Sequence, residues 1–217
     1  MFRIDQPQSL ADRRIADLLQ ELRKAGTYKP LRYLTGPMGA TVRLEDRGEV
    51  VCLCSNNYLG LANHPDVVNA ARRGLDRYGE GTASARFICG TFACHRDVEE
   101  SLAAFCATEA ALTYVSCWCA NEALLGTVVA PADVILSDEL NHASIIDGCR
   151  LAKPRERVVY RHRDLDDLER KLRAAADAEA RWVVTDGVFS MEGAVADLPG
   201  LVTVCRRNDA QLIVDDS

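Results

Sequence analysis

From Asp97 onward the sequence alternates short apolar runs with longer amphipathic segments, and this alternation limits the folds available to the chain. The pattern predicts strands at 111–115, 134–137, 157–160, 182–185 and 211–214, and helices at 97–107, 121–129, 143–152, 165–178 and 199–207. Apolar strands separated by helices are typical of a mostly parallel sheet that is covered on both faces. We therefore predict an α/β domain over residues 50–217, preceded by an N-terminal helix and connecting segment over residues 1–49.

Residues before this region also carry helix and strand signals. Apolar side chains recur at helical spacing over 9–25, and this helix could either cap the core or reach a second subunit. A short strand is predicted at 50–54. A further helix is predicted over 64–79, with Pro65 and Asp66 marking its start and Gly79 its end.

Composition narrows the class of protein and its partners. With 217 residues, 48% of them hydrophobic, the chain can bury a substantial core. A net charge of -6 gives no general attraction to nucleic acid or anionic lipid, so neither is expected as a partner and small molecules are. No stretch is long and apolar enough to span a membrane, and no signal peptide is apparent at the start.

The cysteines indicate a reducing compartment. The sequence has nine of them, and they fall within apolar patterns rather than at paired-ligand spacing. Cys117 and Cys119 are separated by one residue, which is closer than zinc sites usually require, so no metal is predicted. We expect an intracellular protein, located in the cytoplasm, or in the mitochondrial matrix if the source is eukaryotic.

Four predicted strands end in polar groups, and in such sheets ligands bind beyond the carboxyl ends of the strands. The candidates are Ser116 in "SCWCAN", His142 in "DELNHAS", Ser190 in "DGVFSMEG", and Asp215. Each has a simpler interpretation: a helix cap, a solvated or capping histidine, a turn serine and a strand-end aspartate. Together they offer amides for a phosphate, a flat ring, a hydroxyl and a carboxylate, which are the groups that a phosphorylated pyridine needs.

The motifs that contain these residues resemble a known family, the pyridoxal-phosphate-dependent α-oxoamine synthases. They are "SNNYLGLANHP" (55–65), "ARFICGT" (85–91), "LNHASIIDGCRLAK" (140–153), "TDGVFSMEG" (185–193) and "IVDDS" (213–217). Within the family, "RFICGT", "LNHASIIDG" and "TDGVFSM" are most similar to the branch that condenses glycine with acetyl-CoA. The resemblance implies the type I aminotransferase fold, with an incomplete large domain over 50–217 and no C-terminal small domain in this sequence.

The same resemblance implies roles for individual residues. His142 would stack on the pyridine ring, and Asp215 would pair with the ring nitrogen, which makes these two the predicted catalytic residues. Ser190 would bond the phenolic oxygen and Asn56 the substrate carboxylate. The phosphate would lie at the turn that contains Ser116, Cys117 and Trp118, although a tryptophan stands where relatives commonly have phenylalanine.

The family's chemistry also needs a lysine that carries the cofactor, and none of the lysines present is placed for it. They are Lys24, Lys29, Lys153 and Lys171, and none follows a strand end at the predicted site. We therefore expect the lysine to lie beyond residue 217 and the isolated chain to be inactive.

The reaction implied is the formation of 2-amino-3-ketobutyrate and CoA from glycine and acetyl-CoA by a homodimer, with the reverse direction serving threonine degradation. Two alternatives stay open. One is another acyltransferase of the family, which would use serine, alanine or glycine with a longer acyl chain. The other is a noncatalytic fragment or pseudoenzyme that only packs against a partner.

Overall fold

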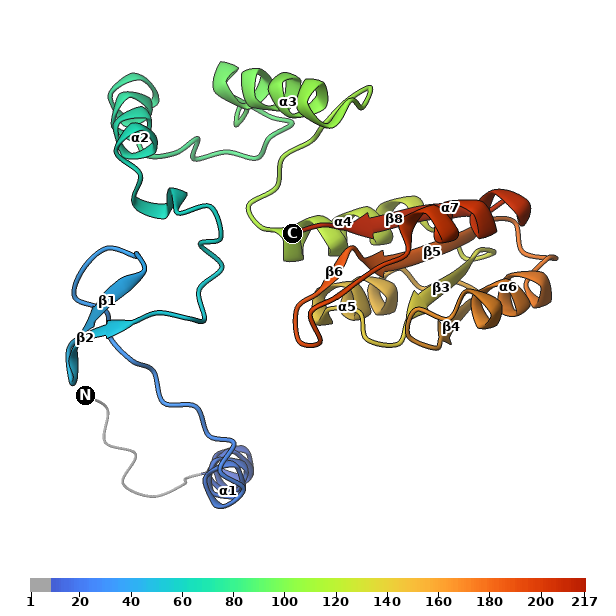
Figure 1. Cartoon of the computed structure of the whole chain (residues 1–217), viewed down its shortest axis with the longest axis horizontal. Helices are drawn as coiled ribbons and strands as arrows, with labels where there is room; N and C mark the ends of the chain where they lie inside the picture. The colour runs from blue at the N-terminus through green and yellow to red at the C-terminus, as the bar shows by residue number, and fades with distance from the viewer. Residues whose placement is uncertain (1–8) are drawn as a thin grey trace. The chain divides into compact units, whose positions relative to one another are not determined.

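The computed structural model describes residues 9–217 and divides the chain into two compact units, Met1–Gly90 and Thr91–Ser217 (Figure 1). The sequence pattern placed a domain boundary between residues 49 and 50, and that assignment stays a prediction. Each unit is built from its own helices and strands.

A four-stranded sheet forms the centre of the C-terminal unit, in the order β4-β3-β5-β8. The strands are β3 (Val134–Asp138), β4 (Glu156–Tyr160), β5 (Arg181–Asp186) and β8 (Gln211–Asp215). All three pairings are parallel, with Leu136 opposite Val158 on one side and Val183 on the other. The prediction of a parallel sheet is confirmed for these strands.

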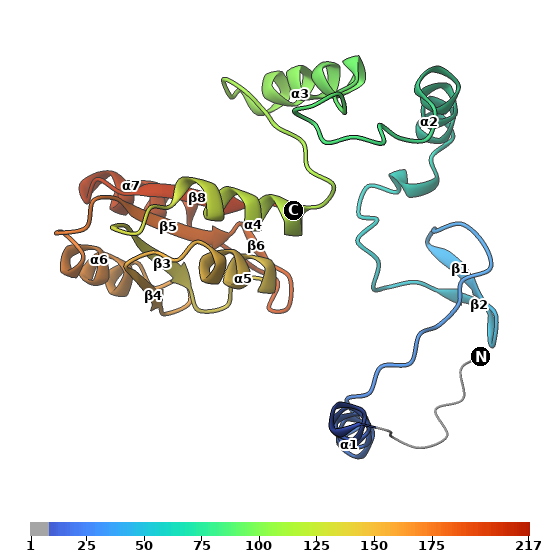
Figure 2. The ribbon, with the colours of Figure 1, turned by 180° about the vertical axis from the view of Figure 1, so that it is seen from behind.

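Helices cover both faces of this sheet. Successive strand residues point to opposite sides, so each face presents its own apolar side chains to the helices. On one face Leu136 and Val183 pack with residues of α6 (Leu165–Ala174) and α7 (Leu198–Arg207). On the other, Ile135 and Val184 pack with residues of α4 (Cys117–Val128) and α5 (Ala143–Leu151). Accordingly α7 lies in front of the sheet in Figure 1, and α4 lies in front of it in Figure 2.

Two predicted elements of this unit need correction. The strand predicted at 111–115 is wrong: these residues form no strand and pair with none in the described chain, and the amide of Thr113 donates instead to the Glu99 carboxylate at 2.9 Å. Without a neighbouring strand, an apolar run has no hydrogen-bond ladder to join. The helix predicted from 121 begins at Cys117, because Ser116 caps it by accepting from the Cys119 amide at 3.1 Å.

Two further features of this unit differ from the prediction: one was missed, and the other was predicted only in part. A hairpin of β6 (Val188–Phe189) and β7 (Ala194–Val195) follows β5, and strands of two residues are too short to give an alternating pattern. Helix α3 spans Ala93–Cys106, so it begins before the predicted residue 97.

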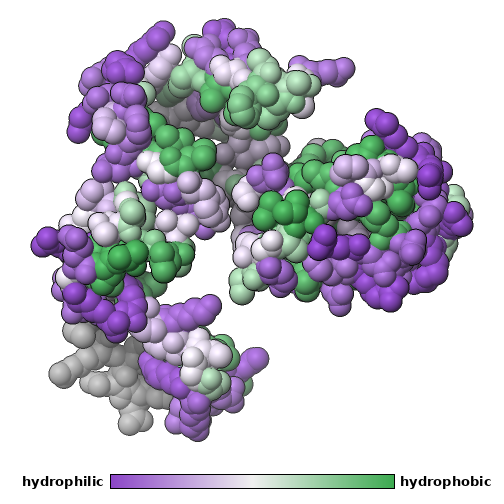
Figure 3. Space-filling view, viewed as in Figure 1, coloured by the Kyte–Doolittle hydropathy of each residue, from purple (hydrophilic) through white to green (hydrophobic). Residues whose placement is uncertain are grey.

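The N-terminal unit contains two amphipathic helices and a hairpin. The helices are α1 (Leu10–Lys24) and α2 (Pro65–Tyr78), both as predicted, and η1 (Leu61–Asn63) is a short 3-10 turn before α2. The hairpin pairs β1 (Thr41–Leu44) with β2 (Gly48–Val51), so the predicted strand at 50–54 ends earlier than expected. Neither helix has a buried residue, and Figure 3 shows apolar side chains at the surface of this unit. Over residues 9–217, none of the helices has the length and apolarity that a membrane span requires.

Candidate functional site

The carboxyl ends of β3, β5 and β8 meet at one edge of the sheet, because the three strands are parallel and adjacent. The chain leaves β3 toward the outer strand β4 on one side, whereas β5 is followed by β8 on the other. The connections therefore diverge between β3 and β5, and α/β sheets bind ligands at such a divergence. Figure 1 shows the C-terminus at this edge, beside the start of α4.

Asp215, the last residue of β8, is 9% exposed and lies in a cluster of donors. Its Oδ2 accepts from the Asn121 side-chain amide at 2.7 Å. Its Oδ1 accepts from the Ser217 backbone amide at 3.0 Å and faces the Cys117 thiol at 3.4 Å. These contacts hold the carboxylate next to the first turn of α4.

Asp186, the last residue of β5, is the second carboxylate of the site, and the two differ in their pKa. Burial would raise the pKa of Asp215, but the hydrogen bonds from Asn121 and Ser217 outweigh it and lower that pKa. For Asp186, burial dominates and, together with the charge of Asp215, raises its pKa despite the bond from the His142 amide. Because the two environments separate the pKa values, Asp215 is the anion of the pair that persists over the wider pH range.

His142 caps the start of α5, and its backbone is fixed to the end of β5. Its amide donates to Asp186 Oδ2 at 2.7 Å. The preceding residue, Asn141, donates to the Val184 carbonyl at 2.8 Å and accepts from the Asp186 amide at 2.9 Å. The buried Asn141 side chain thus joins two strand ends, while the imidazole of His142 is exposed and available to a ligand.

The tautomer of His142 follows from its contacts. The backbone amide of Ser144 can only donate, and it reaches His142 Nδ1 at 3.3 Å. The Ser144 hydroxyl lies 2.8 Å from the same nitrogen. Nδ1 is therefore the acceptor, and the ring proton resides on Nε2.

The start of α4 forms the third side of the site. Ser116 satisfies the amide of Cys119, whereas no hydrogen bond within residues 9–217 satisfies the amides of Cys117 and Trp118. Free amides at the start of a helix attract an anion such as phosphate. The Trp118 ring meets the His142 ring edge to face, with centroids 5.8 Å apart, so the two aromatic groups lie side by side.

The Cys117 thiol faces this carboxylate cluster. Burial and the nearby charge of Asp215 raise the pKa of the thiol, so it stays protonated and acts as a donor to the carboxylate. Cys117 is therefore placed as a supporting group and not as a nucleophile.

These contacts fit a phosphorylated pyridine, which needs free amides and a carboxylate that stays charged. The structure thus brings together Ser116, Cys117, Trp118, His142 and Asp215 of the predicted set. Ser190 lies in the exposed turn between β6 and β7, and no hydrogen bond in the described chain joins it to this cluster. Asn56 belongs to the N-terminal unit, where its side chain accepts from the Tyr58 hydroxyl at 3.4 Å. Their roles stay predictions.

The lysines of the C-terminal unit lie away from the cluster. Lys171 is on α6, where its ammonium binds Asp167 at 2.7 Å and the Val159 carbonyl at 2.6 Å. Lys153 follows the far end of α5, next to the segment where the Arg155 amide bonds the Asp133 carbonyl before β3 begins. Since α5 starts at the carboxyl edge of the sheet, Lys153 lies toward the opposite edge.

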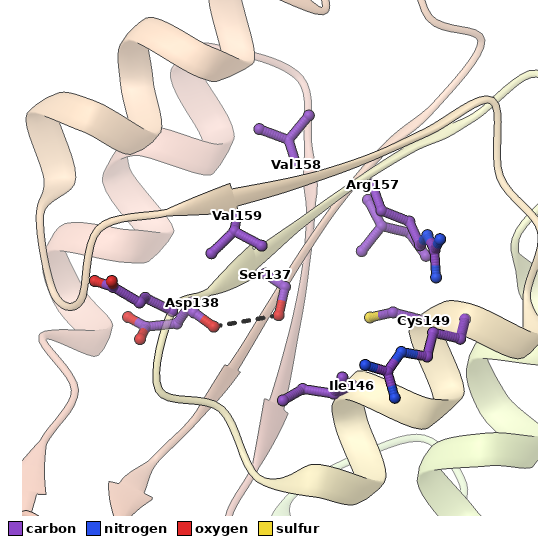
Figure 4. A pocket seen from close by; sticks show the side chains of 10 residues that line it. Ser137, Asp138, Ile146, Cys149, Arg157, Val158 and Val159 are labelled. Carbon is purple, nitrogen blue, oxygen red and sulfur yellow. Dashed lines mark hydrogen bonds between the residues drawn. The ribbon is translucent and has the colours of Figure 1, made fainter.

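A cavity of about 320 Å³ opens elsewhere on the same unit, between α5 and the β3–β4 edge of the sheet (Figure 4). Its lining includes Ser137, Cys149, Arg157 and Val159, and the Ser137 hydroxyl donates to the Asp138 carbonyl at 3.3 Å. None of the predicted site residues lines this cavity. We therefore place the candidate site at the strand ends and not in the cavity.

Three residues of the cluster were not predicted: Asn121, Ser144 and Asp186. Asn121 and Ser144 are inside helices, where a polar residue is usually solvated or caps a turn. Spacing offered one signal, because Asn121 is four residues after Cys117 and so shares its helix face. The position of Asp186 at the end of an apolar strand offered another.

Known proteins are similar to this chain in sequence. A family model described as "Aminotransferase class I and II" matches residues 48–217. The 2-amino-3-ketobutyrate coenzyme A ligase of Escherichia coli K12 is 47% identical over 201 residues, which are 92% of this chain and 50% of that protein. The 8-amino-7-oxononanoate synthase of Geobacter sulfurreducens is 48% identical over 205 residues, which are 94% of this chain and 52% of that protein.

Solved structures are also similar. A serine palmitoyltransferase of Sphingomonas wittichii matches 98% of this chain and 53% of its own, with a TM-score of 0.86 and 32% identity. The enzyme of the same kind from S. paucimobilis, described with a bound PLP-myriocin aldimine, matches 97% of this chain with a TM-score of 0.87 and 28% identity. The chain spans about half the length of these relatives.

Proposed function

The chain belongs to the aminotransferase class I and II family, and we propose from that premise that it is part of a pyridoxal-phosphate-dependent acyltransferase of the α-oxoamine synthase kind. Its fold is the type I fold of that cofactor class, as predicted. The observation that carries the proposal is the strand-end cluster. A charged carboxylate, an exposed imidazole and free helix amides lie together there. Asn121 bonds the Asp215 carboxylate, Asp186 bonds the backbone amide of His142, and the Trp118 ring contacts the His142 ring.

Pyridoxal phosphate, when bound, supplies an electron sink for a carbanion on the amino-acid substrate. The amides of Cys117 and Trp118 would hold its phosphate, with Ser116 fixing the turn. Asp215 would accept a hydrogen bond from the protonated pyridine nitrogen, and its lowered pKa keeps that acceptor charged. His142 would present its ring face to the pyridine, Ser190 would donate to the phenolic oxygen, and Asn56 would bind the substrate carboxylate.

We propose that the Schiff-base lysine comes from outside these residues, because Lys153 and Lys171, the lysines of the C-terminal unit, lie away from the strand-end cluster. In this account the 217-residue chain alone is inactive, and the whole protein acts as a homodimer. The domain assignment of 50–217 as the cofactor-binding region belongs to the same proposal.

The substrates proposed are glycine and acetyl-CoA, which give 2-amino-3-ketobutyrate and free CoA, with the reverse reaction in threonine degradation. The motif "ARFICGT" and the similarity to the Escherichia coli ligase support this choice. A second candidate is the 8-amino-7-oxononanoate synthase reaction, because the Geobacter enzyme is similar to the same extent. A noncatalytic role is the remaining alternative.

Cofactor binding tests the proposed site. In the purified protein, Asp215→Asn should weaken pyridoxal phosphate binding about tenfold or more in an absorbance titration, because a charge-assisted bond to the pyridine is lost. Asp216→Asn is the matched control, since Asp216 is the exposed neighbour and should leave the affinity unchanged. Equal affinities for wild type and Asp215→Asn would contradict the proposed site.

Substrate choice is tested separately by measuring CoA release by the whole protein. Glycine is offered with acetyl-CoA and then with thioesters of longer acyl chains. Faster turnover with acetyl-CoA supports the first candidate. A preference for a long acyl group would favour the second candidate.

A further inference from the structure

The side-chain amide of Asn121 lies between the two groups that the proposed function uses most. Asn121 is 8% exposed and projects from α4. Its Nδ2 carries two protons, and its two nearest acceptors are Asp215 Oδ2 at 2.7 Å and Ser144 Oγ at 2.9 Å, with the Cys117 sulfur farther away at 3.8 Å. Because a charged carboxylate only accepts, the amide must present its nitrogen to this side.

The direction of the hydrogen bonds continues from Ser144 to the imidazole. Ser144 is 1% exposed, so its hydroxyl proton needs a protein partner. The oxygen of this hydroxyl already accepts from Asn121. The hydroxyl can donate its own hydrogen bond to His142 Nδ1, which lies 2.8 Å away. The order of donation is therefore Asn121 to Ser144 to His142, with a second branch from Asn121 to Asp215.

We propose that Asn121 is a positioning residue for the cofactor site: it orients the Asp215 carboxylate and, through Ser144, holds His142 in the tautomer protonated at Nε2. This inference rests on the proposed function. Asn121 is not a catalytic residue in this account, since it acts through Asp215 and His142.

The arrangement also leaves one acceptor position on Asp215. Within the described chain, Oδ1 is engaged by Cys117 and Ser217, whereas Oδ2 is engaged only by Asn121. A carboxylate oxygen has two lone-pair positions, so Oδ2 keeps one for the pyridine proton. Asn121 thus selects which oxygen meets the ligand.

The test uses Asn121→Asp, which keeps the shape of the side chain and removes its donors. The carboxylate introduced by Asn121→Asp would accept a hydrogen bond from the Ser144 hydroxyl. The Ser144 oxygen could then accept a hydrogen bond from His142 Nδ1. Part of the His142 population should therefore shift its ring proton from Nε2 to Nδ1, against the Ser144 backbone amide, which reaches Nδ1 at 3.3 Å in wild type. At the same time the new charge next to Asp215 should weaken pyridoxal phosphate binding about tenfold or more.

The tautomer is read from the ¹⁵N shifts of histidine in the protein without cofactor, at about pH 8, where an ordinary histidine is neutral. His142→Gln assigns the signal. Asn69→Asp is the matched control: it makes the same change on exposed helix α2, where the Asn69 side chain accepts a hydrogen bond from Arg72 at 3.2 Å, and it should change neither reading.

Ser144→Ala is the second variant, in case two adjacent carboxylates prevent folding. It cuts the branch to His142 and leaves the branch to Asp215 intact. Only the longer bond from the residue 144 backbone amide, 3.3 Å in wild type, then remains on Nδ1, so the His142 signal should show a weaker preference for the Nε2 tautomer, while pyridoxal phosphate binding falls less than in Asn121→Asp.

The outcomes separate this inference from the proposed function. A tautomer change in Asn121→Asp or in Ser144→Ala, together with weaker cofactor binding, supports the positioning role. An unchanged His142 tautomer in both variants overturns it, whatever the affinity. If wild type binds no pyridoxal phosphate at all, the proposed function fails, and the tautomer shifts still decide whether Asn121 directs the hydrogen bonds.

Discussion

At the scale of single residues, a buried carboxylate with a lowered pKa does not by itself mark a site. Asp215 and Asp167 both have a lowered pKa, but the groups that hold the two carboxylates differ. Asp215 is held by uncharged donors at the strand ends and keeps an acceptor position. Asp167 is held chiefly by Lys171, with the Arg161 amide at 2.9 Å and the Arg170 guanidinium as further donors, so its charge is already neutralised within the protein.

Asp167 should therefore control part of the stability at low pH. Its pKa in the folded protein lies below its ordinary value of 3.8, so the folded state binds its proton less readily than the unfolded state. The stabilisation is present above pH 3.8 and is lost as the pH falls below that value, toward the folded pKa. In Asp167→Asn the free energy of unfolding should be lower at pH 7 and should fall less between about pH 4 and 2.5 than in wild type.

Urea unfolding at a series of pH values measures this difference. Asp166→Asn is the control, because Asp166 precedes Asp167 on α6 but its side chain is exposed. Parallel pH profiles for wild type and Asp167→Asn would show that the ion pairs do not stabilise the fold.

At the scale of elements, the strands were predictable because each is a short apolar run between helical patterns, and β3 and β5 are also buried along most of their length. Once the strands were predicted, His142 and Asp215 followed, because ligands bind at the polar residues beyond the carboxyl end of each parallel strand. The apolar pattern failed at 111–115, where an equally apolar run has no partner strand in the described chain. It could not find Asn121 or Ser144, because contacts between α4 and α5 depend on how the helices pack and not on their own periodicity.

Close packing of α4 and α5 is what brings Asn121 to Ser144. A Cβ added to Gly148 on α5 would lie 2.9 Å from the Asn121 carbonyl oxygen and 3.0 Å from Leu125 Cδ1. Gly148→Ala should therefore push the helices apart and lower the free energy of unfolding by about 1–3 kcal/mol. Gly126 on α4 has nothing within 4 Å of an added Cβ, so Gly126→Ala should be neutral or stabilising by about 1 kcal/mol.

Chemical denaturation of the two variants makes a matched comparison. The account also expects Gly148→Ala to weaken pyridoxal phosphate binding, since Asn121 moves with α4. Equal stability of the two variants would mean that the helix contact tolerates an extra methyl group.

At the scale of the whole molecule, the chain carries more exposed apolar surface than a stable monomer usually shows. Large side chains of the N-terminal unit are nearly fully exposed, including Leu31 at 83%, Leu53 at 93% and Phe87 at 89%. The apolar faces of α1 and α2 are likewise uncovered by their own unit. The proposed homodimer would give such surfaces a partner.

The isolated 217-residue chain should therefore associate or precipitate at micromolar concentration. Sedimentation velocity over a range of concentrations measures this directly. A monodisperse monomer that melts in one cooperative transition would contradict the expectation.

The central claim is that these residues form the cofactor site but do not supply the lysine. The most direct measurement is to titrate this chain with pyridoxal phosphate, reduce it with borohydride and map the labelled peptides. We predict an absorbance change that Asp215→Asn weakens, with no stoichiometric label on Lys24, Lys29, Lys153 or Lys171. Stoichiometric labelling of any one of these lysines would show that the cofactor binds elsewhere and would contradict the account.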